Sequence, residues 1–154
     1  MTDIHADNRG LVVICDQCGQ RNRAGYESLA QTFRCGQCHH ELHPTAVPVE
    51  IQDEKAFGAL IDRSELPVLV DFWAPWCGPC RMVSPALEQV ATELAGRIKL
   101  VKVNVDDSPK LQQRFNVMAI PTLMVLRHGQ VAAQRAGAVP AASLRAWVEE
   151  ILGS

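Results

Sequence analysis

The stretch PVLVDFWAPWCGPCRMVSPALEQVATELAG, residues 67 to 96, decides the fold of this chain. Its β-branched apolar run from Val68 to Trp73 predicts a buried strand, and a short turn connects that strand to a segment with helical periodicity. One face of the predicted helix carries Leu87, Val90, Ala91 and Leu94. Cys77 is therefore expected where the helix begins, directly after the strand.

The two cysteines of this stretch, Cys77 and Cys80, have the spacing of a redox dithiol. Unpaired amides and the dipole at a helix N-terminus favour a thiolate, so the pKa of Cys77 should be lowered and Cys77 should be the nucleophile. It follows the turn 74–76 and should also be the more solvent-accessible sulfur, while Cys80 resolves the mixed disulfide. Gly78 and Pro79 restrict the loop between them, and Pro79 suits a first helical turn. Metal binding is the alternative, but no free fourth pair remains to complete such a site.

The other four cysteines form two more C-x-x-C pairs, Cys15 with Cys18 and Cys35 with Cys38. The sixteen residues between Cys18 and Cys35 match the spacing of a four-thiolate zinc site, so these cysteines are predicted to bind one structural Zn²⁺. A glycine or a turn-prone polar residue follows each pair, which lets the loop point backbone amides at sulfur. Two additional redox pairs, or ordinary thiols, are the alternative.

Histidines near the second pair allow two other kinds of site. Cys35, Cys38 and His39 match the C-x-x-C-H signal for covalent haem attachment, but such attachment generally belongs to exported proteins and needs a second axial ligand. A Cys3His zinc site that uses His39, His40 or His43 is also possible, although four well-spaced cysteines need no replacement. No organic cofactor is predicted.

The composition, with 47% hydrophobic residues in 154, is sufficient for one core and a small appendage. Residues 1 to 45 have few large apolar side chains and are predicted to form a module stabilised by bound metal, followed by one domain at residues 46 to 154. A formal charge of −2 argues against nucleic-acid binding. No stretch has the pattern of an export signal or a membrane span, so a cytoplasmic location without membrane association is expected.

Three further motifs follow WCGPC in order: KLVKVNVD at residues 99 to 106, AIPT at 119 to 122 and HGQVAAQRAGAVP at 128 to 140. With these motifs, residues 46 to 154 resemble the thioredoxin family. The leading cysteine pairs make the whole chain similar to the thioredoxin 2 type, which carries an N-terminal zinc-binding extension. The resemblance implies an α/β thioredoxin fold, a mixed central β-sheet flanked by helices on both faces, with a small zinc-ribbon-like module.

Hydrophobic periodicity agrees with this fold independently of the resemblance. The predicted strands are residues 46 to 51, 68 to 73, 98 to 105, 122 to 127 and 130 to 135. The predicted helices lie near residues 53 to 62, 77 to 95, 108 to 115 and 141 to 152.

Asp71 interrupts the apolar run of a strand that is expected to be covered on both faces, where burial raises the pKa of a carboxyl group. The resemblance assigns it the role of general base toward Cys80. Lys102 stands at the position of the family's lysine and is expected to pair with Asp71 through the sheet. A carboxylate at a solvated strand edge and a surface lysine are the alternatives.

The resemblance also implies a substrate-binding surface around the cysteines. Pro121 would be cis and would lie against the sulfurs, which leaves the backbone of Ile120 free to pair with an extended substrate. Trp76, together with Gly78 and Pro79, would shape the exposed part of this surface.

These features predict a protein-disulfide reductase that acts by dithiol–disulfide exchange through Cys77 and Cys80. Its expected substrates are disulfide-containing proteins. The resemblance implies an NADPH-dependent thioredoxin reductase as electron donor, because the chain has no Gly-rich nucleotide motif. A monomer is expected. The alternative is a zinc-ribbon module that directs the fold to a partner or regulates it by redox-linked loss of metal.

Overall fold

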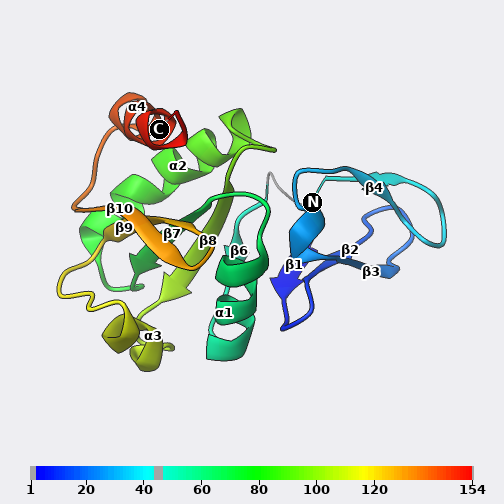
Figure 1. The fold of residues 1–154 in the computed structure, drawn as a ribbon, viewed down its shortest axis with the longest axis horizontal. Coiled ribbons are helices and arrows are strands. Elements are labelled where there is room, and N and C mark those ends of the chain that lie inside the picture. Colours follow the sequence, from blue (N-terminus) through cyan, green and yellow to red (C-terminus); the bar gives the residue numbers. More distant parts are fainter. Residues whose placement is uncertain (1–2, 44–46, 154) are drawn as a thin grey trace.

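A five-stranded mixed β-sheet forms the centre of the structure, a computed structural model that describes residues 3–43 and 47–153. Its strands are β6 (Val49–Glu50), β7 (Val68–Trp73), β8 (Lys99–Asn104), β9 (Thr122–Arg127) and β10 (Gln130–Ala136). They lie in the order β10-β9-β7-β8-β6 (Figure 1). β7 pairs in parallel with β8 and antiparallel with β9, so it occupies the middle of the sheet.

Helices cover both faces of this sheet. They are α1 (Glu54–Arg63), α2 (Gly78–Glu93), α3 (Pro109–Arg114) and α4 (Ala141–Leu152). Figure 1 shows α2 and α4 together on one side of the sheet and α1 and α3 on the other. The strands and helices of the sequence-based prediction are therefore present, and the fold is the predicted mixed sheet between two helical layers.

Side chains along β7 alternate between the two faces of the sheet, which determines which of them lie on the face that α2 covers. Val70 and Phe72 lie in the core that α1 contributes to, whereas Leu69 packs with side chains of α2 and α4. Because successive side chains of a strand point to opposite faces, Asp71 lies on the α2 face of the sheet.

The N-terminal segment consists of short antiparallel strands. They are β1 (Asp3–Ala6), β2 (Leu11–Ile14), β3 (Arg21–Ala24), β4 (Phe33–Arg34) and β5 (Glu41–Leu42), with a short 3₁₀ turn, η1 (Tyr26–Ser28), after β3. β1, β2 and β3 form one sheet, and β4 pairs with β5. One C-x-x-C pair lies in the turn between β2 and β3, and the other lies in the turn between β4 and β5.

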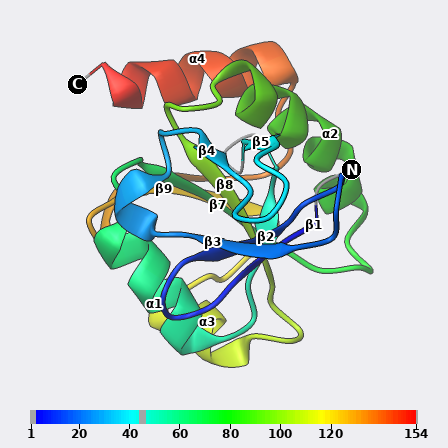
Figure 2. The same cartoon turned by 90° about the vertical axis from the view of Figure 1, so that its right-hand side faces the viewer.

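This segment packs directly on α1 and on β6, the edge strand of the central sheet. Leu11, Tyr26 and Leu29 share one hydrophobic core with α1. The Arg63 side chain at the end of α1 donates to Glu27 at 2.7 Å. Figure 2 shows β1, β2 and β3 crossing in front of the central sheet.

The shared core differs from the expectation for the first 45 residues. The sequence predicts a module whose few apolar side chains leave metal as its main source of stability. The structure places three of those side chains, Leu11, Tyr26 and Leu29, in a core common to both parts, so burial of apolar surface on α1 also stabilises the segment. Val13 and Leu42 instead pack with Cys15 and Cys35.

Two sequence-based boundaries lie outside the described residues: the junction between residues 45 and 46, and the start of the first predicted strand of the main domain at residue 46. Among the residues that the structure describes, no helix combines the length and the hydrophobicity needed to span a membrane.

Candidate redox centre and metal site

The dithiol of WCGPC lies at the start of α2. Cys77 is the N-cap residue of this helix, and its Sγ accepts a hydrogen bond from the backbone N–H of Cys80 at 3.2 Å. The two sulfurs form a disulfide bond, and the Cα atoms are 5.3 Å apart. Pro79 falls in the first helical turn, where its missing amide leaves no intrahelical hydrogen bond unmade. Strand, turn and helix therefore build the site as the sequence predicts.

The two cysteines differ in hydrogen bonding more than in exposure. Cys77 is 4% exposed and Cys80 is 2% exposed in the disulfide form. The expectation that Cys77 is the more accessible sulfur concerns the reduced dithiol and stays a prediction. An amide at a helix N-terminus favours negative charge on a sulfur that it contacts, so the hydrogen bond to Cys77 Sγ is consistent with the prediction that Cys77 is the nucleophile.

Asp71 is fully buried on β7. Burial raises the pKa of its carboxyl group to about 7, with Lys102 acting to lower the pKa and Glu50 acting to raise it. Neither carboxylate oxygen has a hydrogen-bond partner among the described residues. Asp71 and Cys80 line the same small cavity of about 90 Å³. A carboxyl group that exchanges its proton near neutral pH thus shares a cavity with the second cysteine.

Lys102 is the register partner of Asp71 on β8, but its ammonium makes other contacts. Its Nζ donates to Ser84 Oγ at 2.5 Å and lies 5.6 Å from the centroid of the Trp73 ring. No ion pair joins it to Asp71, whose oxygens have no partner in the described part of the chain. The predicted pairing through the sheet is therefore only a through-space effect on the pKa of Asp71.

Two of the residues expected to contact substrate, Trp76 and Ile120, help to line an open groove of about 380 Å³, whereas Gly78, Pro79 and Pro121 do not line it. The Trp76 ring is 68% exposed, and its Nε1 donates to Asp106 Oδ2 at 3.0 Å. Met118, also in this groove, is 86% exposed. The peptide bond between Ile120 and Pro121 is cis, as the resemblance implies. Both polar and apolar side chains line this open groove, and Trp76, one of them, directly precedes Cys77 in the chain.

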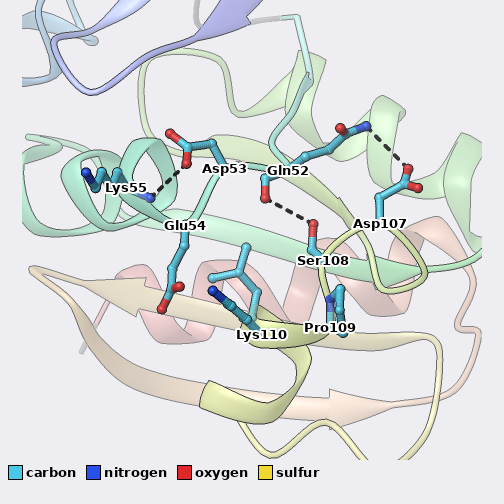
Figure 3. Close-up of a pocket in the computed structure, with 9 residues that line it drawn as sticks. Gln52, Asp53, Glu54, Lys55, Asp107, Ser108, Pro109 and Lys110 are labelled. Carbon is cyan, nitrogen blue, oxygen red and sulfur yellow. Dashed lines mark hydrogen bonds between the residues drawn. The ribbon is translucent and has the colours of Figure 1, made fainter.

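A second hollow, of about 420 Å³, lies away from the cysteines, between the starts of α1 and α3 (Figure 3). Its polar groups contact one another. Figure 3 shows the Gln52 side chain donating to Asp107, and the Ser108 hydroxyl donating to the Gln52 carbonyl oxygen. Asp53 caps α1 by accepting from the amides of Lys55 and Ala56. None of the predicted site residues lines this hollow.

The four remaining cysteines converge from the two hairpins. The Sγ atoms of Cys15, Cys18, Cys35 and Cys38 all lie within 4.8 Å of one another. Two of the sulfur–sulfur distances, Cys15 to Cys38 and Cys18 to Cys35, are 3.6 Å. Four sulfurs about 2.3 Å from a tetrahedral Zn²⁺ are about 3.8 Å apart, so this spacing fits a four-thiolate ion site.

The two cysteine turns have the same backbone hydrogen bonds. The amide of Gly19 donates to the Cys15 carbonyl at 2.8 Å, and the amide of His39 donates to the Cys35 carbonyl at 3.0 Å. Gly19 and His39 both have positive φ, 78° and 64°. His39 therefore holds a turn position for which glycine is favoured.

The other two histidines also point elsewhere. His40 Nε2 lies 3.7 Å from Asp16 Oδ1, and His43 Nε2 lies 3.4 Å from Glu41 Oε1. The group of potential metal ligands found among the described residues contains the four cysteines and no histidine. These observations favour a four-cysteine set over a Cys3His set.

The surroundings do not affect all thiols of the cluster alike. Despite a hydrogen bond from a backbone amide to each sulfur, burial and neighbouring cysteine sulfurs raise the pKa of Cys38 to about 12 and also raise that of Cys18. The pKa of Cys35 is lowered to about 6, chiefly by a hydrogen bond from the Cys38 amide, and the Gln37 amide also donates to its sulfur at 3.4 Å. The Asn22 side chain accepts from the Gly36 amide at 3.0 Å and so connects β3 to the second turn. The four sulfurs could hold one metal ion.

Two side chains at the redox centre have no part in the sequence-based prediction. Ser84 binds Lys102, and Asp106 binds the Trp76 indole. Ser84 follows Cys80 by four residues on α2, so helical periodicity alone indicates that the two share a face. Asp106 comes after β8 and is adjacent to Trp76 only in the folded chain, so no local pattern indicates it.

Comparison with known proteins agrees with this geometry. The family model described as Thioredoxin matches residues 48–150. Thioredoxin C-3 of Corynebacterium nephridii is 38% identical over 142 residues, which cover 92% of this chain and 96% of that protein. Thioredoxin of Haemophilus influenzae is 45% identical over 94 residues, or 61% of this chain and 88% of the relative. Thioredoxin 1 of Chlorobaculum tepidum is 50% identical over 94 residues, which cover 61% of this chain and 93% of that protein.

Proposed function

The chain belongs to the thioredoxin family, and from that premise we propose that it is a general protein-disulfide reductase acting through Cys77 and Cys80. One observation carries the proposal: the bonded cysteine pair begins α2, and its second member shares a cavity with the buried carboxyl group of Asp71. The groove that Trp76 and Ile120 line supports a polypeptide substrate beside this pair.

Reduction of a substrate proceeds in two exchange steps. The Cys77 thiolate attacks one sulfur of the substrate disulfide, a mixed disulfide forms, and the other substrate sulfur leaves as a thiolate. Cys80 then transfers its proton to the Asp71 carboxylate and attacks Cys77 Sγ. The bond between Cys77 and the substrate breaks, the second substrate thiolate leaves, and the Cys77–Cys80 disulfide remains. Two electrons have moved from the protein dithiol to the substrate.

The dithiol must then be restored by an external donor. The proposed donor is an NADPH-dependent thioredoxin reductase, because the sequence has no nucleotide-binding motif of its own. The proposed setting is a reducing cytoplasm, in which the protein acts as a monomer on folded or partly folded disulfide-containing proteins.

The four-cysteine cluster is proposed to hold one structural Zn²⁺, coordinated by Cys15, Cys18, Cys35 and Cys38. The sulfur spacing and the hydrogen bond to Cys35 from Gln37 support this ligand set. The bound ion would crosslink the two hairpins and so stabilise the segment that packs on α1.

Metal analysis of the purified protein tests the zinc assignment. One zinc per chain is expected, and Cys35→Ser with Cys38→Ser should lose it. Cys77→Ser with Cys80→Ser is the matched control and should retain it. Equal zinc content in the two double variants would contradict the ligand set.

A disulfide-reduction assay tests the function itself. The reduced protein should cleave the disulfides of a model protein, and NADPH consumption should follow when a thioredoxin reductase is added. Cys77→Ser should abolish both signals. A Cys77→Ser protein that still reduces the model substrate would contradict the proposal.

A further inference from the structure

The cavity next to the redox centre contains a hydroxyl group that the exchange mechanism does not use. Besides Asp71 and Cys80, the cavity is lined by Ser84 and Lys102. We propose that Ser84 is a positioning residue, whose hydroxyl holds the Lys102 ammonium out of contact with the Asp71 carboxyl group. The inference rests on the proposed function, because Asp71 matters as a base only if Cys80 loses a proton during exchange.

The Lys102 ammonium contacts Ser84 and Trp73 and, within the described part of the chain, forms no ion pair with Asp71. Its Nζ donates to Ser84 Oγ at 2.5 Å and lies 5.6 Å from the centroid of the Trp73 ring. Ser84 is one helical turn after Cys80 on α2, so its hydroxyl reaches the sheet from the same side as the resolving cysteine. The Lys102 ammonium is therefore bound to a side chain of α2, although the Lys102 backbone lies in β8.

Without the Ser84 hydroxyl, the ammonium has a competing partner close by. Lys102 and Asp71 are register partners on adjacent parallel strands. Both carboxylate oxygens of Asp71 lack a hydrogen-bond partner among the described residues. An unpaired buried carboxylate is costly and attracts a nearby cation, so loss of the Ser84 contact favours an ion pair between Lys102 and Asp71.

The other charged and titratable groups around Asp71 do not depend on Ser84. Glu50 acts on the carboxyl group from β6. From α2, Cys80 and Arg81 line the cavity, but the Arg81 guanidinium donates to the Pro75 carbonyl. On β9 the register partner of Asp71 is the apolar Leu123. Lys102 on β8 is thus the cation whose distance from Asp71 the Ser84 contact controls.

The contact matters for the reaction because it sets how readily Asp71 accepts a proton. Burial raises the pKa of Asp71 to about 7, and Lys102 already lowers it from a distance. Direct contact would lower the pKa further and make the carboxylate a weaker base toward Cys80 at neutral pH. Ser84→Ala should therefore lower the pKa of Asp71 by about 1 unit, the lower end of the range for a newly adjacent opposite charge.

Carbon-13 NMR titration of the Asp71 carboxyl group tests the proposal directly. The disulfide form is used, because Cys77 and Cys80 do not titrate in it and the carboxyl signal is read alone. Ser84→Ala should fold, since alanine has a higher helix propensity than serine. Ser84→Thr should restore the original titration, and Thr92→Ala, which removes an exposed hydroxyl of the same helix, should leave it unchanged.

A double-mutant cycle identifies Lys102 as the group through which Ser84 acts. In a Lys102→Met background the titration of Asp71 should not respond to Ser84→Ala. An unchanged or raised pKa in Ser84→Ala, or the same downward shift without Lys102, overturns the proposal. The titration needs no catalytic turnover, so failure of the reductase function in the disulfide-reduction assay is a separate result.

Discussion

The buried carboxyl group of Asp71 should make the protein less stable as the pH rises. Its pKa is raised from the ordinary 3.8 to about 7 by burial, so the native state binds this proton more tightly than the unfolded chain. Below about pH 4 the group is protonated in both states and carries no charge penalty. Between about pH 4 and pH 7 the unfolded state ionises first, and the free energy of unfolding falls as the pH increases. Above about pH 7 the full penalty applies.

The size of this penalty follows from the displacement of the pKa. The rise of the Asp71 pKa from 3.8 to about 7 corresponds to about 4 kcal/mol, because a pKa difference of one is worth about 1.4 kcal/mol. Asp71→Asn removes the ionisation but keeps the shape of the side chain. The variant should therefore gain up to about 4 kcal/mol over the parent protein between pH 4 and pH 8.5. Any cost of burying the amide offsets the variant equally at every pH, so it does not alter how the difference from the parent changes between pH 4 and pH 8.5.

Denaturant unfolding of the disulfide form at a series of pH values measures the effect. The quantity compared is the difference in unfolding free energy between Asp71→Asn and the parent at each pH, so effects of pH on the cysteine cluster cancel. Asp62→Asn, a change of an exposed aspartate, is the control and should give a flat difference. A flat difference for Asp71→Asn as well, or one that falls with pH, would refute the burial argument.

Two further predictions concern the N-terminal segment. His39→Gly should raise the unfolding free energy of the zinc-loaded protein by about 1 kcal/mol, because His39 has a positive φ of 64°, which favours glycine. Gly19→Ala, at the equivalent position of the other turn, should lower the unfolding free energy by a similar amount. Urea unfolding measures both changes, and equal effects of the same sign would contradict the equivalence of the two turns. Tyr26→Ala should cost about 3 kcal/mol or more, because the buried ring lies in the core shared with α1 and its hydroxyl donates to the Asp7 carbonyl. Thermal unfolding detects that loss, and an unchanged midpoint would mean that the segment does not stabilise the rest of the fold.

The sequence predicts the redox centre well because its signals are local. A β-branched run, a turn and a helical apolar pattern are sufficient to place Cys77 at the start of α2. An acid within that run is sufficient to predict that Asp71 is buried with a raised pKa. The spacing of two cysteine pairs likewise predicts their convergence, which the sulfur distances confirm.

The features that the sequence does not predict depend on contacts between distant segments. The sequence assigns Tyr26 and Leu29 to a module with too few apolar residues for a core of its own. In the structure both side chains lie in a hydrophobic core that they share with α1. The resemblance predicts that Lys102 pairs with Asp71 through the sheet; the two are register partners, but the Lys102 ammonium binds a helix side chain instead. Strand register fixes where a long side chain begins and leaves open where its charged end lies.

Trapping of the mixed disulfide tests the central claim, that Cys77 attacks substrate and Cys80 resolves the adduct. Cys80→Ser should still attack a model disulfide but should remain covalently bound to it, because no resolving thiol is present. Mass spectrometry of the adduct should identify Cys77 as the attached residue, and Cys77→Ser should form no such adduct. Adducts attached instead to Cys15, Cys18, Cys35 or Cys38, or equal trapping by the Cys77→Ser protein, would contradict the assignment of nucleophile and resolving cysteine.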